Sequence, residues 1–107
     1  MGIISGGEGK YRIWLKVERL GDGMVCILGG GERSHVGGVV VKEPGKEAKV
    51  IGVDGHYDDR VLLPIAEAAS RKYNMTVAAL GGVHVDNATK AEIDILVANC
   101  MELAKCI

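Results

Sequence analysis

The sequence has no phenylalanine, one tryptophan, three tyrosines and two prolines among its 107 residues. A core built from it must therefore be aliphatic. No apolar stretch approaches the ~18 residues that span a bilayer, so we expect no membrane segment. The 13 basic and 14 acidic side chains nearly cancel, and this balance does not indicate nucleic-acid binding. The composition favours a small cytoplasmic domain that contacts neither nucleic acid nor membrane.

Cysteine is also scarce. Cys26, Cys100 and Cys106 form an odd set without a CxxC pair, which argues against a disulfide framework and a four-thiolate zinc site. Free, buried thiols are the simplest interpretation. The chain has no GxSxG motif, and Ser34 is adjacent to His35 rather than opposed to it. We therefore expect no independent enzymatic activity.

Glycine, by contrast, is abundant, with 16 residues, about twice its usual share of roughly 7%. Because proline is rare and no Gly-X-Y period occurs, the excess indicates neither collagen nor disorder. Most of these glycines stand beside a histidine or in the strand leading to one, at 29–31, 37–38, 52, 55 and 81–82. This placement predicts tight turns, or backbone that a ligand can approach closely.

The first half of the chain predicts strands, from alternating or valine-rich apolar residues. Gly21, Asp22 and Gly23 supply a hairpin turn between the first two. The predicted strands cover residues 11–20, 24–28, 35–42 and 48–53.

The second half predicts helix, strand, helix. The first helix follows Asp58 or Asp59, the candidate N-caps, and ends near residue 74; Pro64 implies a distorted first turn or a later start. A short strand covers 75–80, and a capping box of Thr89 and Glu92 opens the last helix.

This order, β-β-β-β-α-β-α, predicts an α+β fold with a mainly antiparallel sheet and both helices on one face. The other face then needs its own cover, because Trp14 and the alternate valines of residues 36–41 would expose apolar surface there. A homodimer through the sheet or the helix layer is the simplest cover.

All three histidines, His35, His56 and His84, stand beside glycine at predicted element ends. With Asp86 they match a zinc ligand set, but no two have the spacing of HxH or HxxxH, so we expect no metal. The glycines at 29–31 lack the Gly-Lys-Ser/Thr of a P-loop, yet their N–H groups could approach a phosphate. The start of the last helix, with Lys90, suits an anion or is simply capped.

Three segments, in this order and spacing, resemble a known family: LGGGERSHVG at 28–37, DGHY at 54–57 and GVHVDNATKAEI at 82–93. Over roughly residues 24–96 the chain resembles the family of small accessory components of gallate decarboxylase, described as prenylated-flavin chaperone-like. It also resembles the fold of the small proteasome assembly chaperones, a sheet with two helices that assembles as dimers.

The resemblance implies one domain over residues 1–107 with an accessory role. The domain would bind prenylated FMN and deliver it to a decarboxylase that uses this cofactor, or assemble with that enzyme, as a homodimer. The family's residues are matched at His35, Gly37, Asp54, Gly55, His84, Thr89 and Lys90. The expected cofactor-binding rim adds Gly29, Gly30, Gly31 and His56.

The resemblance departs at His56, where the family has an arginine, and at Asp58 and Asp59, where it is more basic. These departures weaken the inference of phosphate binding at that edge. The alternative function is a protein-interaction module like the small proteasome assembly chaperones, with no small-molecule ligand.

Overall fold

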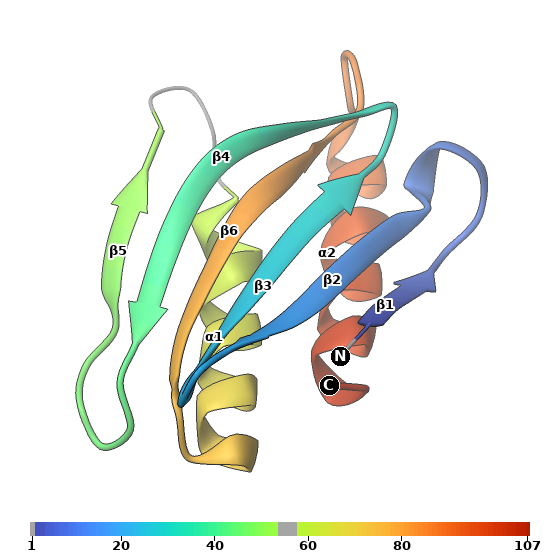
Figure 1. Ribbon diagram of the computed structural model, residues 1–107. Coiled ribbons are helices and arrows are strands. Elements are labelled where there is room, and N and C mark those ends of the chain that lie inside the picture. The colour runs from blue at the N-terminus through green and yellow to red at the C-terminus, as the bar shows by residue number, and fades with distance from the viewer. Residues whose placement is uncertain (1, 54–57) are drawn as a thin grey trace.

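The computed structural model describes residues 2–53 and 58–107. These residues form one six-stranded sheet, two α-helices and a short 3-10 helix (Figure 1). In chain order the elements are β1 (Gly2–Gly6), η1 (Gly9–Tyr11), β2 (Ile13–Leu20), β3 (Gly23–Gly30), β4 (Arg33–Lys42), β5 (Lys49–Gly52), α1 (Asp59–Tyr73), β6 (Thr76–His84) and α2 (Lys90–Lys105).

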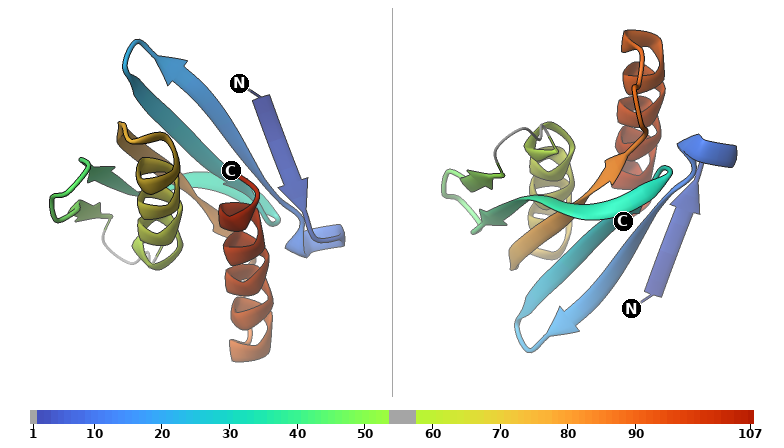
Figure 2. Two further views of the ribbon diagram at one scale, coloured as in Figure 1. Left: turned by 90° about the horizontal axis from the view of Figure 1, so that it is seen from below. Right: turned by 90° about the horizontal axis from the view of Figure 1, so that it is seen from above.

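The strands lie in the order β1-β2-β3-β6-β4-β5. Only β3 and β6 pair in parallel, and the other neighbours are antiparallel. Both helices lie on one side of the sheet, α1 against β4 and β6 and α2 against β1 and β2 (Figure 2). The expected α+β class, mainly antiparallel with both helices on one face, is therefore confirmed.

The N-terminal strand β1 was not predicted. It pairs with β2, for example Ile4 with Leu15, although its glycine-rich sequence lacks an alternating pattern. Backbone hydrogen bonding to the outer edge of β2 is sufficient, because strand pairing depends on the main chain as well as on side-chain alternation. The chain therefore contains one more strand than its sequence pattern indicates.

The first helix begins where its cap position predicts. It starts at Asp59 and continues through Pro64 to Tyr73, so the alternative of a late start is wrong. A proline near the start of a helix removes one intrahelical N–H bond, here the one to the carbonyl of Arg60. The loss does not stop the helix from forming.

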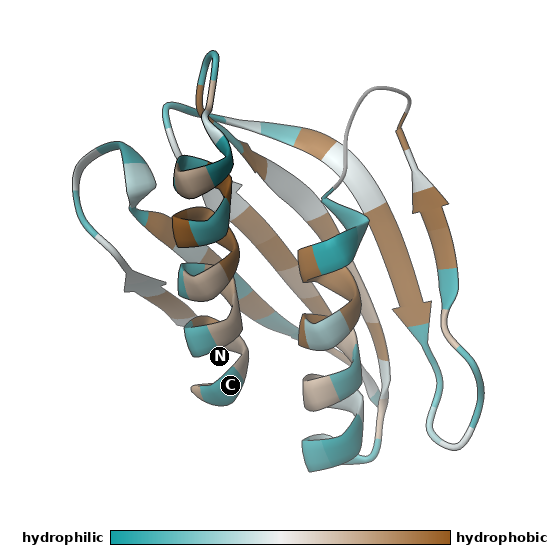
Figure 3. Ribbon diagram, turned by 180° about the vertical axis from the view of Figure 1, so that it is seen from behind, coloured by the Kyte–Doolittle hydropathy of each residue, from teal (hydrophilic) through white to brown (hydrophobic). Residues whose placement is uncertain are grey.

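The core is aliphatic, as predicted, and lies between the sheet and the two helices. Figure 3 views it from the helix side, with hydrophobic strand residues behind both helices. Its largest fully buried side chains are Ile13, Leu15, Leu28, Leu62, Ile65, Val40, Val77, Cys26 and Cys100. Cys106 is exposed. None of the helices in the described part of the chain is long and apolar enough to cross a membrane.

Candidate functional site

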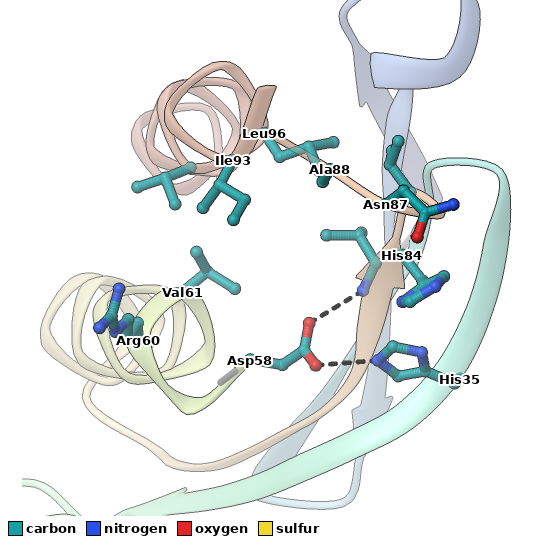
Figure 4. A pocket seen from close by; sticks show the side chains of 12 residues that line it. His35, Asp58, Arg60, Val61, His84, Asn87, Ala88, Ile93 and Leu96 are labelled. Carbon is teal, nitrogen blue, oxygen red and sulfur yellow. Dashed lines mark hydrogen bonds and ion pairs between the residues drawn. The ribbon is translucent and has the colours of Figure 1, made fainter. Parts of the chain in front are cut away.

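Asp58, the residue before α1, joins three elements. Its carboxylate Oδ2 lies 2.8 Å from Nε2 of His35 on β4, and its Oδ1 accepts the N–H of Val83 on β6 at 3.0 Å (Figure 4). Its main-chain carbonyl accepts the N–H of Leu62 at 2.9 Å. The Asp58 side chain is 8% exposed. This one residue therefore fixes the start of α1 to two neighbouring strands.

The interpretation of Asp58 as an N-cap is only half right. It occupies the N-cap position, but its φ of −67° and ψ of −18° are helical, and its side chain makes no cap hydrogen bond. An N-cap that bonds its own helix has extended dihedral angles, as Thr89 does before α2 with φ −74° and ψ 166°. The Asp58 carboxylate is instead committed to the sheet.

Two glycines make room for the pair of Asp58 and His35. A Cβ on Gly37 would overlap the Asp58 carboxylate. A Cβ on Gly82 would lie 2.6 Å from His35 Nε2 and 2.7 Å from Asp58 Cγ. The glycines beside these histidines therefore serve close packing of the pair. Gly37 was among the predicted site residues, whereas Gly82 was not.

His84 belongs to a second polar group nearer the surface. Its Nε2 lies 2.9 Å from Asp86 Oδ1, which also accepts a hydrogen bond from Arg33 at 2.8 Å. The rings of His35 and His84 have centroids 5.7 Å apart and are tilted by 58°. Two of the three predicted histidines thus converge, while His56 lies outside the described residues.

A cavity of about 350 Å³ opens beside these histidines, between the starts of α1 and α2 and the end of β6 (Figure 4). One side is polar and the other is aliphatic. Ile93, at 43% exposure, belongs to this aliphatic wall. The lining consists of His35, Asp58, Arg60, His84 and Asn87 on the polar side, and Val61, Val83, Val85, Ala88, Ile93, Leu96 and Val97 on the aliphatic side. Such a combination suits a ligand with a flat or branched apolar part and a few hydrogen-bonding groups.

The glycines at 29–31 do not line this cavity. A Cβ on Gly29 would overlap the Trp14 indole, and one on Gly30 would lie 2.5 Å from the carbonyl oxygen of Arg12. Gly31 has a φ of +72°, and its Cβ would lie 2.5 Å from the carbonyl oxygen of His84. Packing within the protein therefore accounts for all three.

Thr89 and Lys90 also lie outside the cavity lining. Thr89 forms the predicted capping box with Glu92. The Lys90 side chain is 91% exposed, with its Nζ 3.5 Å from Asp94. The remaining predicted site residues, Asp54, Gly55 and His56, lie outside the described residues. No group of three or more His, Cys, Asp or Glu side chains suited to a metal occurs within residues 2–53 and 58–107.

Comparison with known proteins identifies the family. Residues 7–107 match the model of the prenylated flavin chaperone LpdD-like domain. The chain belongs to this family. The predicted resemblance is confirmed, and the LpdD-like domain extends beyond the residues 24–96 on which it was based. No curated protein matches the chain.

The fold of this LpdD-like domain also occurs in a solved structure described as a novel chaperone complex for yeast 20S proteasome assembly. The two chains are 15% identical, with a TM-score of 0.60, over 99% of this chain and 92% of the other. At that identity the likeness concerns the fold, which agrees with the resemblance noted from the sequence.

Sequence reasoning missed Asp58, Arg60, Asn87 and the aliphatic wall of the cavity. Asp58 was interpreted only as a cap, because a carboxylate before a helix usually serves that purpose. One signal was present: Gly37 and Gly82 stand in two different strands, each two residues from a histidine. Such glycines indicate that another group approaches the strand closely.

Proposed function

We propose that the chain is an accessory protein that binds prenylated FMN and delivers it to, or assembles with, a decarboxylase that uses this cofactor. The observation that carries the proposal is the cavity, where two histidines and a buried carboxylate face an aliphatic wall. The family description supports prenylated flavin as the cargo. The protein would act as one domain in the cytoplasm and as a homodimer.

The lining fits the chemistry of this group. A prenylated flavin has a flat ring system with an added apolar ring, which the wall of Val61, Leu96 and Val97 suits. His35 and His84 bring hydrogen-bonding groups to the flavin's carbonyl and ring nitrogen atoms. Arg60 brings a guanidinium, the group that binds phosphate with two parallel hydrogen bonds.

The rim outside the cavity completes the proposed site. Thr89 and Lys90 stand at the start of α2, beside the lining residue Ala88. They are placed to meet the phosphate end of a ligand that extends beyond the cavity, because a helix N-terminus and a cation both favour an anion. Asp54, Gly55 and His56 belong to the same proposed rim.

We propose no carbon chemistry for this chain on its own. The Ser34 hydroxyl accepts the N–H of Gly30 at 3.0 Å rather than facing a base. Burial raises the pKa of the Cys26 thiol to about 11 and, with a smaller contribution from the charge of Asp58, that of Cys100 to about 12. Thiols in that state are poor nucleophiles.

Titration of the purified protein with prenylated FMN tests the binding function. We expect the visible absorbance of the flavin to change and to saturate. Val97→Asp should weaken binding at least tenfold, since it places a carboxylate in the aliphatic wall, whereas Lys46→Ala, in the loop after β4, should not. An unchanged spectrum at saturating cofactor would refute the carrier function.

The alternative function is protein assembly without a flavin, which the shared fold with a proteasome assembly chaperone supports. Affinity purification of the tagged protein from its native cells separates the two. One stoichiometric protein partner without bound flavin would favour assembly. Co-purification of flavin, released on denaturation and identified by mass, would favour the carrier.

A further inference from the structure

The face of the sheet away from the helices has no element over it among the described residues (Figure 1). Strand pairing places six residues in one row across this face, because directly paired residues point to the same side. Five of the six are apolar. From edge to edge the row reads Ile3, Lys16, Ile27, Leu80, Val39 and Ile51.

A second row runs parallel to it and has charged ends. Its members are Glu18, Val25, Ala78, Val41 and Lys49. We call the two rows together the open face. Their chain neighbours Val17, Cys26, Ala79 and Val40 are buried under the helices, and side chains alternate along a strand, so both rows point away from the helix layer.

The open face is apolar where most exposed surfaces are not. Ile3 is 65% and Ile51 68% exposed, and the three valines, Ile27, Ala78 and Leu80 are partly exposed. Contiguous apolar surface of this kind marks an interaction site. The distribution of charge at its margins indicates which partner it fits.

Two opposite charges flank the second row. The acid Glu18 lies on β2 and the base Lys49 on β5, each two strands from the central strand β6. Since neighbouring strands lie about 4.8 Å apart, each charge stands roughly 10 Å to one side of β6. The row therefore has opposite charges at equal distances from its middle.

We propose that the open face binds a second copy of this chain, sheet against sheet, about a two-fold axis that runs along β6. Such an axis exchanges the two sides of each row. Glu18 then faces Lys49 of the second copy and Lys49 faces its Glu18, while Val25 meets Val41 and Ile27 meets Val39. Ala78 and Leu80 lie near the axis and meet their own counterparts.

The remaining position of each row also fits. Lys16 would lie over Ile51 of the second copy, where its aliphatic stem packs against the isoleucine and its ammonium reaches water at the rim. The result is an apolar centre with a charged rim, as protein interfaces have. Two sheets packed face to face with nearly aligned strands are a common arrangement, and an interface that matches itself is what a two-fold dimer requires.

This inference rests on the homodimer of the proposed function and is independent of flavin binding. Its first test is the dimer dissociation constant, measured by sedimentation velocity on the full chain. Glu18→Lys and Lys49→Glu should each raise this constant about tenfold or more, because each places like charges opposite each other at two symmetric positions. The double variant, which exchanges the two charges, should return it to within a few-fold of wild type.

A matched control reverses a charge on the helix side. Glu102 on α2 has a side chain that is 71% exposed, so Glu102→Lys should leave the dissociation constant unchanged. All these positions are at the surface, and circular dichroism of each variant verifies that the fold is intact.

Cross-linking gives a second, independent readout. Within one chain Glu18 and Lys49 lie four strands apart, roughly 19 Å, too far for a carbodiimide, which joins a carboxylate and an amine directly. A peptide containing Glu18 joined to Lys49 must therefore come from two copies, and we expect it only in the dimer band.

The outcomes separate the two claims. A wild-type chain that stays monomeric would overturn the homodimer and this interface together. A dimer that resists both charge reversals and yields no cross-link between Glu18 and Lys49 would overturn only the assignment to the open face. In that case the exposed edges of β1 or β5, or the helix layer, would hold the copies together.

Discussion

The carboxylate of Asp58 lies 2.8 Å from the His35 imidazole, from which 23 positions of sequence separate it. The same carboxylate accepts the main-chain N–H of Val83. A contact that joins the start of α1 to β4 and β6 determines both the stability of this region and the shape of the cavity beside it.

Asp58→Ala should lower the free energy of unfolding by about 1–3 kcal/mol, since it leaves the N–H of Val83 without its acceptor. Asp58→Asn should cost less, because the amide keeps an oxygen for that N–H. Urea denaturation measures both. Asp94→Ala on the exposed side of α2 is the control, and a loss no larger than that of the control would contradict this role of Asp58.

Gly82→Ala should destabilise the fold by about 1–3 kcal/mol, the usual cost of overpacking. The added methyl group would meet His35 and Asp58 within 2.7 Å. Gly52→Ala is the matched control, because nothing lies within 4 Å of its Cβ position. Equal unfolding midpoints for the two variants would mean that the pair of Asp58 and His35 does not need the space.

Glu92 should make the stability depend on acid. Hydrogen bonds from the Lys10 ammonium, the Thr89 N–H and the Tyr11 hydroxyl lower its pKa to about 2. A carboxylate with a lowered pKa stabilises the fold above its unfolded pKa of about 4.5, and this contribution disappears as the pH falls from there towards 2.

We therefore expect the wild-type free energy of unfolding to fall more steeply between pH 4.5 and 2 than that of Glu92→Gln. Glu102→Gln, on the exposed face of α2, should follow the wild-type profile. Parallel profiles for wild type and Glu92→Gln would show that Lys10 and Tyr11 do not hold this carboxylate in solution.

The three cysteines should differ in reactivity. With a pKa of about 11 for Cys26 and about 12 for Cys100, less than about a thousandth of either is thiolate at pH 8. Cys106 is exposed. Iodoacetamide at pH 8 should therefore alkylate Cys106 first, as peptide mass spectrometry would show, and the other two only after denaturation. Early alkylation of Cys100 would indicate that α2 opens readily.

Much of this fold follows from local patterns. The alternation in β2, the hairpin at Gly21 and the capping box of Thr89 depend on neighbouring residues, so the sequence was sufficient to predict them. The position of β6 between β3 and β4 was beyond such reasoning, because it depends on pairings between distant segments. The same holds for β1, whose pairing with β2 is a matter of main-chain hydrogen bonds.

The site was predictable only in part. The glycines beside His35 and His84 indicated close approach, and the structure explains Gly37 by the space that Asp58 needs. The cavity itself is bounded by Val61 on one helix and Leu96 on another, whose spacing no sequence pattern gives. The aliphatic wall therefore looked like ordinary core.

The late arrival of β6 has a consequence for how the protein is made. This strand pairs with both β3 and β4, so until it leaves the ribosome the sheet consists of two unconnected parts. The acceptor in Asp58 waits for the same strand, because its partner Val83 lies near the end of β6. Sheet closure and assembly of the cavity are thus one event in biogenesis, and a nascent chain that stops before β6 has neither.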